Sequence, residues 1–153
     1  MSGINIKLFY FIACLNWNCI LAAQNIPIKE VYRVNTFKEA DSLFRKLDFH
    51  YAGTDSSLGI DYYFDKIISS DTVRFVININ DSTGVTTKAY FMKAPSYENF
   101  KRQFKANGYT RLWRMGNKYS SMEAYQTKGG KDLTVAKTDN LYIIYFDRKS
   151  GRN

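Results

Sequence analysis

The stretch Thr36–Phe49, TFKEADSLFRKLDF, predicts a capped amphipathic helix that packs one face against the rest of the chain. Thr36 is a favourable N-cap, and Glu39 three residues later completes the pattern of a capping box. Apolar side chains then recur at the spacing of one helical stripe, at Phe37, Ala40, Phe44 and Leu47.

The stretch Ser96–Tyr109, SYENFKRQFKANGY, has the same plan 60 residues further along the chain. Ser96 stands at the expected N-cap, and Pro95 before it is expected to separate a strand from the helix. The apolar stripe is made of Tyr97, Phe100 and Phe104. Gly108 occupies a position at which a left-handed residue ends a helix. The two stretches predict one helical unit that occurs twice.

Each predicted helix is followed by four segments with a β pattern. In 72–80, Val73, Phe75 and Ile77 alternate with polar residues, which is the period of a half-buried strand. The segments are 49–54, 60–66, 72–80 and 85–93, then 109–115, 119–128, 132–138 and 141–149. Turns are expected at DSTG (81–84), KGGK (128–131) and TDN (138–140). A leading strand, IKEVYRV (28–34), is expected before the first helix.

This order of elements predicts an α+β fold. We expect one antiparallel sheet with both helices on one face, because neighbouring strands joined by short turns need no crossover. The units 36–93 and 96–148 would be tandem repeats related by a pseudo-two-fold axis, each with one helix and three to four strands. The element order is similar to that of the β-lactamase inhibitor proteins. No residue motif of that family is matched, so the resemblance implies an architecture and no function.

The first 23 residues have the organisation of a secretory signal peptide. Lys7 precedes an apolar run at 8–15, and the small residues Ala22 and Ala23 precede Gln24 as at a cleavage site. The segment resembles bacterial signal peptides, which implies an exported protein, periplasmic or secreted, with one domain over 24–153. Cleavage there would remove both cysteines, so we expect no disulfide and no cysteine-based metal site. We also expect no cofactor.

Two other interpretations of this segment stay open. Cys14 follows Phe11-Ile12-Ala13 roughly as in a lipobox, which would make the protein a lipoprotein anchored at Cys14. A membrane anchor is the second interpretation. The 16 residues 8–23 are interrupted by two asparagines, whereas a spanning helix needs about 20 predominantly apolar residues.

The sequence contains none of the common catalytic motifs: GxSxG, HExxH, the P-loop and GxGxxG are all missing. His50 is the one histidine, which does not match a zinc site. Asp61 and Asp65 lie four apart on an expected strand, so both point to one face together with Tyr63. Such paired carboxylates could serve hydrolysis of a glycosidic bond or hold a cation, and with His50 they would fit a small envelope hydrolase or a ligand-binding enzyme. A solvated strand face is the other interpretation.

Trp113 is the aromatic residue to examine for binding. It lies in RLWRMGNKY, and on a regular strand Arg111, Trp113 and Met115 would share one face while Arg114 takes the other. A buried Trp113 would belong to the core. An exposed Trp113 would form an anchor with Arg111 and Tyr119 for a protein or glycan, since Trp, Tyr and Arg dominate binding hot spots.

Charge is distributed unevenly along the chain. Residues 1–84 hold eight Lys and Arg against nine Asp and Glu, and residues 85–153 hold fourteen against five; the nets of −1 and +9 make the total of +8. A basic exported domain predicts an acidic partner. Export and the lack of a nucleic-acid-binding motif argue against nucleic acid. The other interpretation is that the charge only keeps the protein soluble.

These observations predict an exported, non-catalytic binding module. Its partner would be an anionic macromolecule or an acidic protein of the cell envelope. The binding residues expected in the second unit are Lys101, Arg102, Lys105, Arg111, Trp113, Arg114, Lys118 and Tyr119. The first unit lacks such a basic surface, because Asp41, Ser42 and Arg45 stand where the second unit has its helical cations.

Overall fold

The computed structural model describes residues 28–56, 60–68, 70–80 and 84–147, and within them it confirms the predicted α+β class. The helices are α2 (Ile28–Val31), α3 (Phe37–Arg45) and α4 (Ala94–Ala106). The strands are β1 (His50–Asp55), β2 (Ile60–Ile68), β3 (Asp71–Asn80), β4 (Gly84–Lys93), β5 (Tyr109–Gly116), β6 (Ser120–Thr127), β7 (Asp132–Thr138) and β8 (Leu141–Asp147). Each segment predicted as β structure after the two helices forms one of these strands.

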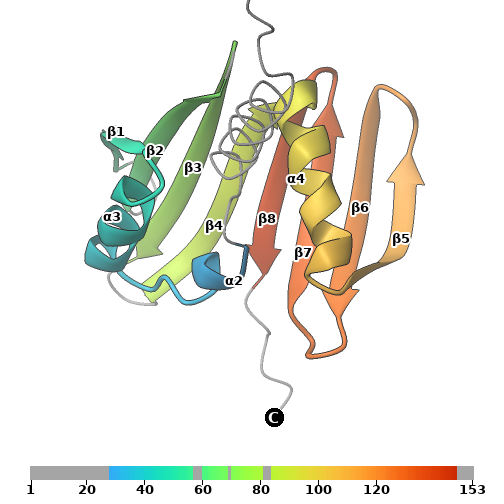
Figure 1. Cartoon of the computed structure of the whole chain (residues 1–153), viewed down its shortest axis with the longest axis horizontal. Helices are drawn as coiled ribbons and strands as arrows, with labels where there is room; N and C mark the ends of the chain where they lie inside the picture. Colours follow the sequence, from blue (N-terminus) through green and yellow to red (C-terminus); the bar gives the residue numbers. More distant parts are fainter. Residues whose placement is uncertain (1–27, 57–59, 69, 81–83, 148–153) are drawn as a thin grey trace, which may run out of the picture.

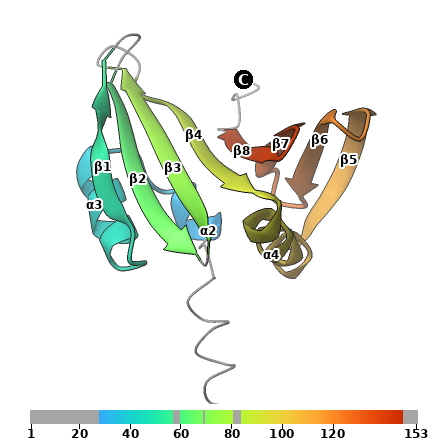
Figure 2. The ribbon, with the colours of Figure 1, turned by 90° about the horizontal axis from the view of Figure 1, so that it is seen from above.

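All eight strands belong to one antiparallel sheet in the order β1-β2-β3-β4-β8-β7-β6-β5. β4 and β8 therefore lie side by side in the middle, and β1 and β5 form the two edges. The helices α2, α3 and α4 lie on one face of the sheet (Figure 1), so the described part of the chain leaves the other face without a helix. Figure 2 shows the sheet bent about β4 and β8, with the helices on the outside of the bend.

The helix α3 begins as its sequence predicts. The Glu39 N–H donates to Thr36 Oγ1 at 3.2 Å, and the Thr36 N–H donates to Glu39 Oε2 at 3.2 Å, which completes the capping box. Ala40 and Phe44 of the predicted stripe are fully buried. Phe44 stacks on Phe75 of β3 with the ring centroids 4.2 Å apart, so the apolar stripe fixes α3 to the sheet.

The helix α4 begins earlier than predicted. It follows β4 directly with Lys93 as the N-cap, and Ser96 is a buried residue of the first turn rather than the cap. Pro95 does not separate strand from helix, because its fixed φ suits the first turn and its missing N–H needs no partner there. The Lys93 N–H donates to Asp71 Oδ2 at 3.0 Å. Gly108 follows the helix with φ at 78°, as predicted for a left-handed stop.

The predicted leading strand at 28–34 is wrong. Its first four residues form the single turn α2, and Ile28 and Val31, three residues apart, are both buried. Lys88 of β4 donates from Nζ to the carbonyl oxygens of Val31 at 3.1 Å and Tyr32 at 3.0 Å. Carbonyl groups at a helix end need such partners. A side chain from a distant strand therefore supports this turn, and the local pattern could not reveal it.

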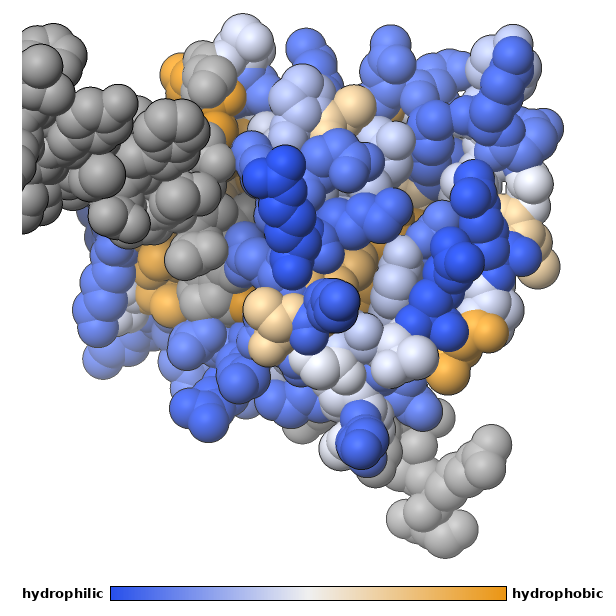
Figure 3. All heavy atoms as spheres, turned by 45° about the vertical axis from the view of Figure 1, so that its right-hand side comes forward, coloured by the Kyte–Doolittle hydropathy of each residue, from blue (hydrophilic) through white to orange (hydrophobic). Residues whose placement is uncertain are grey.

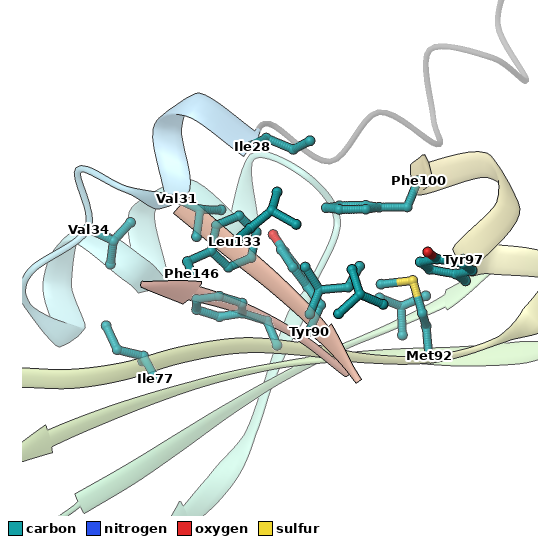
Figure 4. Packing of buried hydrophobic residues seen from close by; sticks show 14 of the residues in the cluster. Ile28, Val31, Val34, Ile77, Tyr90, Met92, Tyr97, Phe100, Leu133 and Phe146 are labelled. Carbon is teal, nitrogen blue, oxygen red and sulfur yellow. The ribbon is translucent and has the colours of Figure 1, made fainter. Parts of the chain in front are cut away.

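Tyr90 of β4 lies at the centre of the core. Its ring centroid lies 6.1 Å from that of Phe44 on α3, 5.6 Å from that of Phe100 on α4 and 5.7 Å from that of Phe146 on β8. Figure 4 shows Tyr90 beside Phe146, with Ile28 of α2 above them. One core thus joins elements from both halves of the sheet.

Two predicted turns are confirmed. KGGK joins β6 to β7, where the Gly130 N–H donates to the Thr127 oxygen at 2.9 Å, and TDN joins β7 to β8. The expected DSTG turn includes 81–83, and the expected signal peptide covers 1–23; both lie outside the described residues. Of the helices that the structure describes, none has the length and apolar character to cross a bilayer.

Candidate binding site on the β5 edge

The strand β5 and its hairpin to β6 expose large apolar side chains. Every residue from 110 to 119 is exposed. The β5 hairpin cluster, as we define it, consists of Leu112, Trp113, Met115, Tyr119 and Met122, with exposed fractions of 57, 43, 60, 61 and 40 %. Figure 3 brings this side of the molecule forward and shows apolar residues set among hydrophilic ones. The interpretation of Trp113 as a core residue is therefore wrong, and exposed apolar surface of this kind is typical of interaction sites.

A β-bulge in β5 sets the direction of its side chains. Arg111 lies opposite Tyr125 of β6, and the next paired residue, Trp113, lies opposite Ala124. Leu112 is therefore an extra residue that has no counterpart on β6. One extra residue shifts the alternation of side chains between the two faces of the sheet.

The bulge brings two arginines to one face. Arg114 lies opposite Glu123, and both Arg111 and Arg114 approach the Glu123 carboxylate on the face that bears the helices. Trp113 and Met115 share the opposite face. The prediction that Arg111 and Trp113 share a face is wrong, because it assumed an uninterrupted period of two.

The buried side chain of Glu123 connects the edge strand to α4. Its Oε1 lies 3.4 Å from Arg114 Nε and 4.0 Å from Arg111 Nη1. The Tyr125 hydroxyl donates to the other oxygen, Oε2. Tyr97 of α4 is hydrogen-bonded to Tyr125 in turn. A continuous line of polar contacts therefore runs from the helix through β6 to the two guanidinium groups.

The electrostatics of this network leave a net positive charge at the surface. Burial raises the pKa of Tyr97, and burial together with the hydrogen bond to Glu123 raises the pKa of Tyr125, so both hydroxyls stay protonated at neutral pH. One carboxylate then faces two guanidinium groups whose side chains are about half exposed. A guanidinium has five N–H donors, so Arg111 and Arg114 keep donors for an external acceptor.

The turn between β5 and β6 is tightly ordered. Gly116 has φ at 98°, and a Cβ atom there would lie 2.3 Å from the Ser120 oxygen, so the turn requires glycine. Asn117 Oδ1 accepts from the Ser120 N–H at 3.0 Å. Lys137 of β7 donates from Nζ to the Lys118 oxygen at 2.5 Å. These contacts hold the hairpin in one geometry, which lowers the entropy lost when it binds a partner.

The three basic residues predicted on α4, Lys101, Arg102 and Lys105, are exposed. Lys101 connects to the network above, because its Nζ lies 5.6 Å from the ring centroid of Tyr97. Lys118 and Tyr119, which were also predicted as binding residues, lie in the hairpin, and Lys118 Nζ is 4.8 Å from the Tyr119 ring centroid. The two arginines thus lie beside Glu123. Lys101 is connected to Glu123 through Tyr97 and Tyr125.

Glu123 and three members of the β5 hairpin cluster were not among the binding residues predicted from the sequence: Leu112, Met115 and Met122. A signal for Glu123 was available. It stands two residues before the buried Tyr125, so it shares the buried face of β6 and needs a cationic partner there.

Of the three residues of the alternative enzyme site, the structure places His50 and Asp65 opposite each other on β1 and β2, with Asp61 farther along β2. Asp65 forms a double contact with Arg74 at 2.7 Å, Asp61 accepts from Asn78 Nδ2 at 2.6 Å, and His50 lies exposed opposite Asp65. Four residues along a strand separate the Cα atoms of Asp61 and Asp65 by about 13 Å. Carboxylate pairs of glycosidases lie about 5–9.5 Å apart. Within the described ranges, no group of three or more His, Cys, Asp or Glu is placed to hold a metal ion.

The candidate site, in the part of the chain that the structure describes, is an exposed surface at a strand edge and its hairpin. It combines an edge strand, exposed apolar side chains and two guanidinium groups. No protein-family model, no curated protein and no solved structure matches this chain.

Proposed function

We propose that this chain is an exported, non-catalytic binding module that engages an anionic macromolecule through β5 and its hairpin. The observation that supports this function is the coincidence, at one sheet edge, of the β5 hairpin cluster with the half-exposed Arg111 and Arg114. Apolar burial would supply affinity, and the guanidinium groups would select for negative charge.

The charge distribution supports an anionic partner. Residues 85–153 carry a net charge of +9, against −1 for residues 1–84. The exposed cations of α4, Lys101, Arg102 and Lys105, lie in this half. Attraction between exposed charges is screened over about 8 Å at physiological ionic strength, so the proposed binding depends on salt.

Retention on an anionic matrix such as heparin, at low and high salt, tests this function. The variant Arg111→Ala/Arg114→Ala is compared with Lys38→Ala/Lys46→Ala, which removes the same charge from exposed positions of the first half. We expect the arginine variant to elute at lower salt than the lysine variant. Thermal melting of both variants separates loss of binding from loss of folding.

Equal losses in the two variants would indicate a bulk effect of charge without a specific surface. No retention of the unmodified chain at low salt would contradict an anionic partner altogether. In that case the basic half serves solubility alone.

Export belongs to the same proposal and has its own test. The organisation of residues 1–23 supports cleavage before Gln24. Intact mass of the exported protein is expected to match a chain that begins at Gln24 and lacks both cysteines. A mass that begins at Cys14 with a diacylglycerol group would indicate a lipoprotein, and an uncleaved chain would contradict the signal peptide.

We also propose that the domain is a tandem repeat with an offset of 60 residues. Asp48 and Gly108, 60 residues apart, both have left-handed backbone conformations, with φ at 60° and 78°. The residues that follow them, Phe49 and Tyr109, are both buried. The symmetric strand order about β4 and β8 supports the same relation. The proposed repeat is similar to the β-lactamase inhibitor proteins in the order of its elements only.

The two edge strands suggest what the doubling achieves. β1 has a bulge between Tyr51 and Gly53, and β5 has its bulge between Arg111 and Trp113, again 60 residues later. The bulge in β1 is therefore flanked by the uncharged residues Tyr51 and Gly53, whereas the bulge in β5 is flanked by the cationic Arg111 and by Trp113. An experimental structure tests the repeat by superposition of 36–93 on 96–148; helices that fail to superpose with their strands would contradict it.

A further inference from the structure

The strand β5 has an outer edge that no described strand covers. It pairs with β6 on one side and stands last in the sheet. All of its residues after Tyr109 are exposed. An uncovered edge presents a row of backbone N–H and C=O groups with which another extended segment can pair.

The part of β5 beyond the bulge is regular. From Trp113 to Gly116 each residue has one partner on β6, without a shift in register. A strand that added along this stretch would therefore meet no irregularity. The ordered turn at Gly116 fixes one end of the stretch.

Side chains on an added strand would meet two different surfaces. Neighbours of Arg114 on the helix-bearing face would lie beside a guanidinium group, which favours a carboxylate. Neighbours of Trp113 and Met115 on the other face would lie beside exposed apolar groups. Because side chains of a strand alternate between faces, the matching segment alternates acidic and apolar residues.

We propose that the partner of this protein adds a strand to β5 through an extended segment in which acidic residues alternate with apolar ones. This inference rests on the proposed function, because it names the chemistry of the partner at the same site. A polypeptide fits this edge better than a glycan or a lipid surface, because only a polypeptide supplies backbone groups at the spacing of the strand together with alternating side chains.

Three short synthetic peptides of one composition test the inference on the full chain. In the first, valine alternates with glutamate; in the second, the valines and glutamates form two blocks; the third is the alternating peptide with every backbone amide N-methylated. We expect binding of the alternating peptide by calorimetry, with slower hydrogen exchange in β5. We expect affinity at least about tenfold weaker for the other two peptides, because each lacks either the alternation or the backbone donors.

Variants of the protein separate this inference from the proposed function. Arg111→Ala/Arg114→Ala is expected to bind the alternating peptide about tenfold more weakly, which a lost charge-assisted contact produces, and Lys38→Ala/Lys46→Ala is expected to bind it unchanged. Equal binding of all three peptides overturns strand addition. Binding of heparin or anionic vesicles that requires the arginines, without binding of the alternating peptide, overturns strand addition and leaves the proposed function standing. If the arginine variant keeps its binding of the alternating peptide and of heparin, both strand addition and the proposed function are overturned.

Discussion

Arg114 and Glu123 lie opposite each other on β5 and β6, with Arg114 Nε 3.4 Å from Glu123 Oε1. Arg111 reaches the same oxygen because the bulge at Leu112 turns it to the same face. One buried carboxylate therefore orients two half-exposed guanidinium groups.

The variant Glu123→Gln is expected to bind anions more tightly while folding less stably. It removes the negative charge between the two arginines and keeps an oxygen that can accept from Tyr125. We expect the free energy of unfolding to fall by about 1–2 kcal/mol, because charged hydrogen bonds are lost. Urea unfolding measures the stability, and the salt needed for elution from heparin measures the binding.

The control for this change is Glu98→Gln, which alters the net charge equally at an exposed position of α4. A similar gain in retention for Glu98→Gln and Glu123→Gln would contradict a special relation between Glu123 and the arginines.

The variant Tyr90→Phe is expected to stabilise the protein. The Tyr90 hydroxyl is buried and has no hydrogen-bond partner among the described residues. Removal of an unsatisfied buried hydroxyl should raise the free energy of unfolding by about 1 kcal/mol. Tyr109→Phe should lower it by about 1 kcal/mol, because the Tyr109 hydroxyl donates to that of Tyr32 at 2.9 Å. Equal effects of the two substitutions in urea unfolding would contradict this assignment.

The variants Phe44→Ala and Phe104→Ala are each expected to lower the free energy of unfolding by about 3–5 kcal/mol. Both rings are buried under the sheet, one from each helix. Leu112→Ala serves as an exposed control and should change stability by less than about 0.5 kcal/mol. A small cost for either phenylalanine would show that its helix contributes little to the core.

Alkaline pH is expected to unfold the protein in step with tyrosine ionisation. Burial raises the pKa of Tyr90, Tyr97, Tyr109 and Tyr125. Their folded pKa lies above the unfolded value of about 10, so stability is complete below about pH 10 and falls as the pH rises above it. Tyrosinate absorbance and circular dichroism, followed together against pH, measure the coupling. Full ionisation of all tyrosines near pH 10 without loss of structure would contradict it.

Local patterns predicted most of the secondary structure. The capping box of Thr36 and Glu39, the stripe through Phe44 and the stop at Gly108 are interactions between residues a few positions apart. The alternation of Val73, Phe75 and Ile77 likewise depends on the strand alone. Such features can be read from the chain because their causes are local.

Other features followed from contacts between distant segments. Residues 28–31 form a helical turn and not a strand, with Lys88 bound at the end of the turn. Ser96 is buried and does not cap α4, because the helix continues directly from β4. Neither the helical turn at 28–31 nor the burial of Ser96 is determined by neighbouring residues in the sequence.

The candidate site divides in the same way. The sequence by itself determined which half of the chain is basic and that Trp113 stands among arginines. The tertiary structure alone decided that Trp113 is exposed, that Arg111 and Arg114 share a face, and that Glu123 lies between them. The physical reason is that a strand acquires its two faces from the register of its neighbour, and one bulged residue reassigns side chains from one face to the other.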